Sequence, residues 1–314
     1  MTSRVQVDGL QRCFYVHPDN VATVRRSLDV NVAIIVRPDR FLAASGAVQL
    51  LVETERGVHT RVFLAEHGSL RFLVVYGRVE RQRTTSLGLD YALTQEVVSF
   101  LGVARLVGTF VAGSVRADEP ASTIYIPHDF VGLGPHDQTR SRGRGVGFRT
   151  IDMFEPFCPS VRDALVAQQP AMDFACRTSG IYACFHGWPR VETEAELRRY
   201  EQDGYDVVGQ TLDPEATLAK EAGTHYAALV ATVDDTDLRE RLIGGDDRAR
   251  TELARYVTTC RERMFRLFLA ALPALHHLEN RPCDCEHQAA RRQFRSEAFY
   301  YRPAYLCPDW DDSD

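Results

Sequence analysis

Short apolar runs alternate with amphipathic stretches along most of the chain. A brief apolar run bounded by turn residues is typical of a buried strand, whereas apolar residues that recur every three or four positions are typical of a helix. The two patterns together indicate an α/β protein. They predict strands at 30–36, 71–77, 104–114 and 122–133, a hairpin or two edge strands over 49–57 and 58–68, and helices at 90–103 and 248–272.

The clearest unit is a strand–helix–strand stretch over 205–232, with YDVVGQT and HYAALVAT as its strands. Between them, Asp213 is expected to cap a short helix, Pro214 to take its first position and Gly223 to close it. The sequence TEAE, which begins at Thr193, predicts a capping box and a further helix. We therefore predict a single α/β domain with a central mixed, mostly parallel sheet flanked by helices.

Composition narrows the possible functions. The chain has 314 residues, 45% of them hydrophobic and 25% charged, as in an ordinary globular protein. A net charge of -6 and a pI near 6.0 argue against a general nucleic-acid binder. No apolar run reaches the ~18 residues of a membrane span, and MTSRVQVDGL lacks the apolar core of a secretion signal. The eight cysteines are therefore expected to be thiols in a reducing cytoplasm.

Polar residues follow two neighbouring strands of the predicted unit. Ligands of α/β folds bind outside the carboxyl ends of parallel strands, which places Gln210 and Thr211 on one rim with the acidic cluster that follows residue 233. This rim is a candidate site. The alternative is that Thr211 and Asp213 only cap and turn the chain. The acidic cluster is Asp234, Asp235 and Asp237.

Several motifs resemble those of the purine nucleoside phosphorylase superfamily, most closely its methylthioadenosine phosphorylase branch. They are LVGTFVAGSVR, MFEPFCPSVRDAL, GWPRVETEAELRRY, DVVGQTLDPEATLAKEAGTHYAAL, VATVDDTD and RPCDCEHQ, and the resemblance spans about 30–288. It implies a domain over 30–280, with an N-terminal extension (1–29) and a C-terminal tail (281–314). It also implies a homotrimer in which a neighbour's loop, for which 134–150 is a candidate, closes the 5′ end of the substrate.

The resemblance also assigns roles to single residues. An acid that shares a proton with purine N7 stabilises the leaving base, and the ungapped alignment places Asp234 there. A shift of this alignment by one residue would instead give the roles to Asp235 and Asp237. We take Asp234 and Asp237 as the catalytic candidates. Gln210 and Thr211 match the pair that lies against the ribose. The remaining substrate-binding candidates are His186, Trp188, Val191, Phe110, Ala112, Gly113, Tyr76 and Arg37.

Three of these candidates depart from the family's base and sugar motif. His186 replaces a glutamate, Trp188 is inserted before Pro189, and Val191 replaces the stacking phenylalanine. Trp188 could take over stacking on the base and His186 the sugar contact. The alternatives are a buried wedge for Trp188 and a satisfied polar residue at a strand end for His186.

The phosphate side departs furthest from the family. Arg37 and Pro38 stand where the family has a Gly-rich turn with a hydroxyl, Tyr76 lies at its Arg-His pair, and Phe110 replaces a Thr or Ser. An anion without donors costs several kcal/mol to bury. We therefore expect cleavage of the N-glycosidic bond of a purine nucleoside, of the adenosine or methylthioadenosine type, by water or another acceptor. The substrate could also be a nucleotide whose phosphate is held by nearby arginines, and the alternative is that these arginines are solvated. The alternatives are a phosphorylase with a rearranged phosphate site and a non-catalytic nucleoside binder. The nearby arginines are Arg37, Arg78, Arg81 and Arg83.

A second group of reactive residues lies near the carboxyl end. Cys283, Cys285 and His287 are metal-ligand types, but two cysteines and one histidine so close in sequence cannot complete a tetrahedral site alone. We expect redox pairing or surface thiols there. The sequence therefore predicts no metal and no cofactor.

Overall fold

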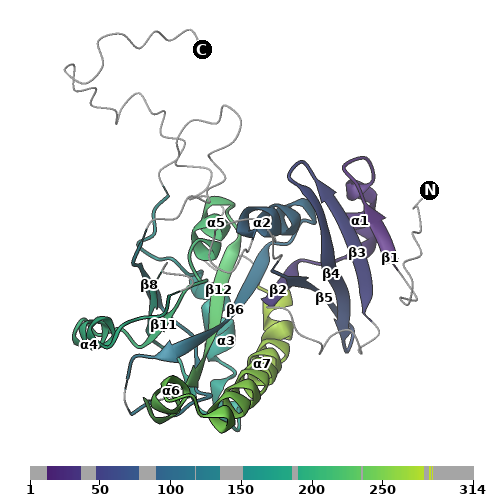
Figure 1. Cartoon of the computed structure of the whole chain (residues 1–314). Coiled ribbons are helices and arrows are strands. Elements are labelled where there is room, and N and C mark those ends of the chain that lie inside the picture. Colours follow the sequence, from purple (N-terminus) through teal and green to yellow (C-terminus); the bar gives the residue numbers. More distant parts are fainter. Residues whose placement is uncertain are drawn as a thin grey trace, which may run out of the picture.

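The computed structural model describes residues 13–36, 47–77, 90–116, 118–134, 151–185, 190–234, 236–278, 283 and 285. Its centre is a mixed sheet flanked by helices, as the sequence predicted (Figure 1). The main path of the sheet runs β1-β3-β4-β5-β2-β6-β11-β10-β8, and β12, β7 and β9 branch from it. The strands are β1 (Cys13–Val16), β2 (Val32–Val36), β3 (Val48–Thr54), β4 (Gly57–His67), β5 (Leu70–Tyr76), β6 (Arg105–Ser114), β7 (Ile124–Tyr125), β8 (Asp129–Gly132), β9 (Cys176–Arg177), β10 (Ile181–Cys184), β11 (Val207–Gly209) and β12 (His225–Asp234).

Helices cover both faces of the sheet. In Figure 1, α2 and α5 lie together near one end of β6 and β12, and the long α7 crosses the other side beside α3. Each pair of helices buries its apolar residues in a separate cluster, so the strands between them are apolar on both faces. The helices are α1 (Val21–Leu28), α2 (Tyr91–Phe100), α3 (Pro159–Val166), the 3-10 turn η4 (Gln169–Ala171), α4 (Glu194–Gln202), α5 (Glu215–Glu221), α6 (Thr236–Ile243) and α7 (Asp247–His276).

The continuous apolar run of β2 shows how the two clusters arise. Ile35 faces the cluster that contains residues of α2 and α5, and Ile34 faces the cluster that contains residues of α3 and α7. Both side chains are at most 1% exposed. Such complete burial requires apolar residues at successive positions, which is why the sequence shows runs rather than strict alternation.

Most local signals in the sequence act as predicted. The capping box at Thr193 is present, and the Asp90 side chain caps α2 by accepting from the Leu93 N–H at 2.9 Å. The start of α5 differs from the prediction. Pro214 is the N-cap rather than the first helical residue. Oδ1 of Asp213 accepts from the Thr217 hydroxyl at 2.6 Å.

The stretch predicted as an N-terminal extension contains two elements that join the sheet. β1 pairs in parallel with β3, and α1 buries Val24 and Leu28 against the apolar cluster that α2 and α5 cover. In the part of the chain that the structure describes, no helix is both long enough and apolar enough to cross a membrane.

Strand β6 positions the rest of the sheet around the candidate site. β12 pairs with β6 in parallel from Arg105 to Gly113 and occupies one edge of it. β2 pairs in parallel with the other edge up to Gly108, and β11 pairs antiparallel with that same edge at Gly113 and Ser114. The carboxyl ends of β2 and β11 therefore point toward each other along one edge of β6.

This arrangement corrects the predicted rim. We expected Gln210 and Asp234 at the carboxyl ends of parallel strands, but β11 is antiparallel to β6 whereas β12 is parallel to it. The two strand ends therefore point in opposite directions. The predicted rim required its strands to run in the same direction. The sequence carries no signal that a strand as short as β11 runs the other way.

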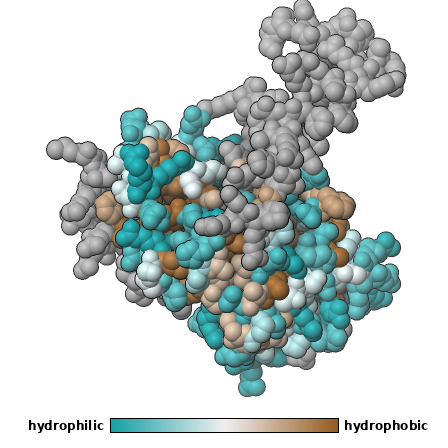
Figure 2. All heavy atoms as spheres, turned by 180° about the vertical axis from the view of Figure 1, so that it is seen from behind, coloured by the Kyte–Doolittle hydropathy of each residue, from teal (hydrophilic) through white to brown (hydrophobic). Residues whose placement is uncertain are grey.

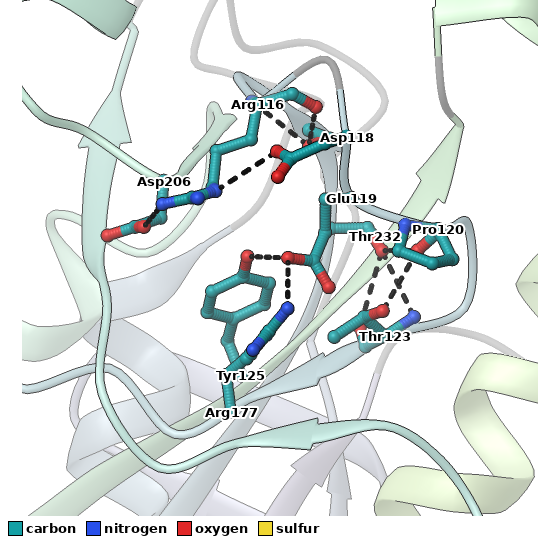
Figure 3. Close-up of polar contacts among 10 residues, drawn as sticks. Arg116, Asp118, Glu119, Pro120, Thr123, Tyr125, Arg177, Asp206 and Thr232 are labelled. Carbon is teal, nitrogen blue, oxygen red and sulfur yellow. Dashed lines mark hydrogen bonds and ion pairs between the residues drawn. The ribbon is translucent and has the colours of Figure 1, made fainter.

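A polar network holds the connection between β6 and β7 (Figure 3). Glu119 is only 2% exposed, and its Oε2 accepts from the Tyr125 hydroxyl at 2.9 Å and pairs with Arg177 at 3.3 Å. Nearby, Arg116 pairs with Asp206 at 3.6 Å. The network fixes the chain directly after Ser114, where β6 meets the candidate site.

Candidate functional site

The last residue of β12, Asp234, contacts the carboxyl end of β6. Its Oδ1 accepts from the Ser114 N–H at 3.3 Å, and its Oδ2 lies 3.3 Å from Nε of Arg239, which comes from α6. Nη2 of Arg239 also donates to the Ser114 carbonyl at 2.9 Å. The side chains of Asp234 and Arg239 are partly exposed, at 18% and 26% respectively. Asp234 is thus a carboxylate held in a fixed direction with one side open to solvent.

A second carboxyl group lies close to this pair. Burial raises the pKa of Glu192 above its ordinary value, the Asp234 carboxylate raises it further, and the Arg239 guanidinium opposes both. Glu192 and Asp234 therefore share the field of one arginine. Sequence reasoning missed Glu192 and Arg239. The signal available for Glu192 was its place directly before the Thr193 cap, inside a motif already singled out.

Gly113 leaves room for the Asp234–Arg239 pair because it has no side chain. A side chain at Gly113 would place its Cβ 3.3 Å from Nη2 of Arg239 and 3.3 Å from Oδ1 of Asp234. That distance is tighter than an ordinary van der Waals contact. The glycine of the AGS motif thus lets the Asp234–Arg239 pair approach the β6 backbone.

Gln210 connects the end of β11 to the same region. Its Nε2 donates to the Arg190 carbonyl at 3.0 Å, and Arg190 forms a bidentate pair with Glu196 at 2.7 and 2.9 Å. Its buried Oε1 has no hydrogen-bond partner among the described residues. Val191 follows Arg190 and is 68% exposed. The segment 190–192 thus runs from Gln210 to the neighbourhood of Arg239.

The edge of β6 between β2 and β11 forms the second part of the site. The Thr109 hydroxyl donates to the Ile35 carbonyl at 2.8 Å. Phe110 is 1% exposed, with its ring 6.3 Å from that of Tyr182, and Thr211 is buried at 7%. Phe110 and Ala112 point into the apolar cluster that α2 and α5 cover. The Phe110 side chain therefore offers no donor to an anion, as predicted from the sequence.

Tyr76 does not join Phe110. Its ring packs against Phe63, lies 4.4 Å from the guanidinium carbon of Arg61 and belongs to the cluster on the α7 face. Alternate residues of a strand face opposite sides of the sheet, so Val75 takes the Phe110 side. The residues Arg37, Pro38, Arg78, Arg81, Arg83, His186, Trp188, Pro189 and Asp235 and the loop 135–150 lie outside the described residues, as does the side chain of Asp237.

The described cysteines are all free, and three of them meet a histidine at the other end of β12. The ligand atoms of Cys158, His225, Cys283 and Cys285 lie within 4.8 Å of one another. A hydrogen bond from Cys285 holds the pKa of the Cys158 thiol well below its usual range. The sequence grouped Cys283 and Cys285 only with His287, which lies outside the described residues. The fold brings in Cys158 and His225 instead.

A cavity of about 790 Å³ lies at the amino ends of β2 and β5, away from Asp234. Basic and acidic side chains both line it, among them Arg25, Arg71, His276, Asp29 and Glu66. None of the residues predicted for the site lines this cavity.

The fold is an α/β domain with a mixed, branched sheet, and an acidic side chain lies at the end of β12. The profile described as "Phosphorylase superfamily" matches residues 42–273, and the chain belongs to this family. The sequence prediction of a nucleoside-phosphorylase-like enzyme, which acts on N-glycosidic bonds, is thereby confirmed at the level of the family.

Relatives and solved structures agree with this assignment. An S-methyl-5'-thioadenosine phosphorylase of Thermofilum pendens is 31% identical over 202 residues, 63% of this chain and 72% of the relative. A 6-oxopurine nucleoside phosphorylase of Pyrococcus furiosus is 32% identical over 192 residues, 59% of this chain and 70% of the relative. A mutant adenosine/methylthioadenosine phosphorylase of Schistosoma mansoni shares the fold with a TM-score of 0.69 at 20% identity, over 83% of this chain and 96% of that one.

Proposed function

We propose that this protein cleaves the N-glycosidic bond of a purine nucleoside of the adenosine or methylthioadenosine type, with phosphate as the acceptor. The observation that carries the proposal is the end of β12. Asp234 is fixed there by Arg239 and the Ser114 N–H, across β6 from the edge where β2 and β11 converge. The names of the relatives support the substrate class.

The chemistry of the leaving base explains the acid. As the bond between C1′ and N9 breaks, the sugar becomes positive and the purine negative. A proton taken from solvent by N7 neutralises the base, and the Asp234 carboxylate accepts a hydrogen bond from that N7–H. Arg239 keeps the carboxylate in position throughout, and Glu192 lies within the electrostatic influence of both groups. Asp237 remains the second catalytic candidate.

Two observations bear on which molecule accepts the sugar. The buried Phe110 supports the prediction of an acceptor other than phosphate, but both relatives described above are phosphorylases. We therefore favour phosphorolysis at a rearranged phosphate site over cleavage by water. A phosphate oxygen then bonds to C1′, the purine leaves, and the products are ribose 1-phosphate, or its 5′-substituted form, and free base.

Product analysis with and without phosphate tests this function. Adenosine, inosine, methylthioadenosine and a 5′-nucleotide are each incubated with the protein over a range of phosphate concentrations. We expect turnover that saturates with phosphate and yields a sugar 1-phosphate. Free ribose formed at the same rate without phosphate would show hydrolysis instead. Binding by calorimetry without any turnover would show a nucleoside-binding protein.

We also propose a homotrimer, as the family resemblance implies. The residue just before the EPFCP motif, Phe154, is 90% exposed, which is unusual for so large an apolar side chain. Apolar residues gather in the middle of the face shown in Figure 2, with hydrophilic ones around them. A cytoplasmic location remains a prediction from the sequence.

A further inference from the structure

Four metal-ligand side chains converge where β12 begins. His225 is the first residue of β12, and its Nδ1 lies 3.5 Å from Sγ of Cys158 and 3.2 Å from Sγ of Cys283. Cys285 completes the group, and all four ligand atoms lie within 4.8 Å of one another. Cys158 and Cys285 are buried, whereas His225 and Cys283 are half-buried. We refer to these four residues as the Cys3His cluster.

The spacing fits a tetrahedral metal ion. Zinc–sulfur bonds of about 2.3 Å and zinc–nitrogen bonds of about 2.0 Å put neighbouring ligand atoms about 3.5–3.8 Å apart. The two sulfur–nitrogen distances to His225, 3.5 and 3.2 Å, are close to this value. The widest separation, 4.8 Å, needs only a small contraction. Three cysteines and one histidine are also a donor set found in structural zinc sites.

Thiolates are the form that binds metal, and positive charge lies beside the Cys3His cluster. Cys158 is the N-cap residue of α3, and the N-terminus of a helix favours negative charge. The positive charge of the buried Lys220 acts on Cys285. Three thiolates and Zn²⁺ carry one net negative charge, which this lysine offsets.

We propose that the Cys3His cluster is a structural zinc site. A disulfide would use two of the three thiols and leave the third thiol and the imidazole without a role, whereas a zinc ion uses all four ligands. Binding displaces the thiol protons into solvent and changes no oxidation state. The ion joins the chain after α7 to the start of β12 and to α3, three segments far apart in the sequence.

The site is separate from the proposed catalytic residues. His225 and Asp234 are the first and last residues of β12, so nine strand steps of about 3.3 Å, or about 30 Å, lie between them. Loss of the metal should therefore weaken the fold without removing the acid. The zinc proposal does not depend on the proposed function.

Metal analysis of the full chain tests the proposal. The protein is purified under reducing conditions with zinc supplied, and bound metal is measured by mass spectrometry of the elements. We expect one zinc per chain. Exchange for Co²⁺ should give the strong sulfur-to-cobalt charge-transfer and visible bands of a tetrahedral thiolate site. Chelation should lower the melting temperature, and added zinc should restore it.

Variants identify the ligands. Cys285→Ser and His225→Gln should each lower the zinc content at least tenfold when free zinc is buffered. Cys176→Ser is the matched control, because Cys176 is a free cysteine outside the cluster. If Cys285→Ser does not fold, the cobalt spectrum of His225→Gln decides. The proposal is wrong if the wild type binds no zinc, if both ligand variants keep it, or if non-reduced protein contains a disulfide within the cluster.

Discussion

Asp234 and Arg239 form a pair in which each residue limits where the other can lie. Asp234 ends β12, Arg239 belongs to α6, and both contact the backbone of Ser114. An exposed ion pair contributes little to stability on its own. The pair is more important for position, because two contacts to the backbone of β6 fix the direction of the carboxylate.

The substitution Asp234→Asn tests the role of this carboxylate. Asparagine keeps the size of the side chain but loses the charge that stabilises a protonated purine. We expect kcat to fall about 10²-fold or more, the usual range for an acid–base group. Asp173→Asn is the control, because Asp173 is 71% exposed and pairs only with Arg266 at 2.9 Å among the described ion pairs. Asp237→Ala should have a smaller effect. Equal turnover of Asp234→Asn and wild type would remove Asp234 from the mechanism.

Glu192 should make stability depend on pH. Burial raises its pKa in the folded protein, so the folded state holds this proton more tightly than the unfolded state. The stabilisation is complete below the unfolded pKa, about 4.3, and is lost as pH rises through the folded pKa. Glu192→Gln removes this dependence. Its melting temperature, relative to wild type, should therefore be higher at about pH 7 than at about pH 4.

The exposed Glu201 provides the control for this measurement. Glu201→Gln makes the same chemical change at an exposed position on α4, and its melting temperature is measured at both pH values for comparison. A difference between Glu192→Gln and wild type that stayed constant with pH would show that Glu192 titrates alike in the folded and unfolded protein.

Residues adjacent to a motif could be predicted from the sequence, and their partners from other elements could not. Asp234 was predicted because it ends an apolar strand and matches a family acid. Arg239 and Glu192 lie on a helix and in a loop that meet Asp234 only after folding. In the same way, Cys283 and Cys285 suggested no complete site until the fold added Cys158 and His225.

At the scale of elements, apolar periodicity predicted most strands and helices but not their directions. Both faces of β2 and β6 are buried, so the apolar runs in their sequences were unambiguous. Strand direction depends instead on register and on connections. β11 has only three residues, and its antiparallel pairing with Gly113 and Ser114 decides where Gln210 lies.

The network of Figure 3 predicts a large effect from one buried carboxylate. Glu119→Ala removes the acceptor of the Tyr125 hydroxyl, which is buried, and the partner of Arg177. An unsatisfied buried polar group costs about 1–3 kcal/mol, so we expect the free energy of unfolding to fall by about that amount in urea titrations. Asp118→Ala is the control, since Asp118 is 80% exposed and pairs with Arg116 at 3.5 Å. Equal effects of the two variants would show that the network does not support the fold.

At the scale of the whole molecule, exposed apolar side chains indicate where another subunit could bind. Large exposed apolar side chains in the described part are few, and Phe154 and Ile243 are the most exposed, at 90% and 82%. Phe154 directly precedes the EPFCP stretch, in which Phe157 and Cys158 are buried. A ring so placed, on a segment anchored by its neighbours, suits a contact between identical subunits.

The substitution Phe154→Ser tests the proposed trimer. Light scattering of the wild type at micromolar concentration should give three times the chain mass of 35.4 kDa. Removing the ring takes apolar surface out of the contact, and each Å² of buried apolar surface contributes about 25 cal/mol to the free energy of association. We therefore expect the Phe154→Ser trimer to dissociate at a higher protein concentration than the wild-type trimer, while the circular dichroism spectrum stays unchanged. Ile243→Ser, which removes an equally exposed apolar side chain on α6, should leave the mass unchanged. A wild type that is monomeric at this concentration would contradict the trimer, and a Phe154→Ser variant that dissociates no more readily than Ile243→Ser would place the contact elsewhere.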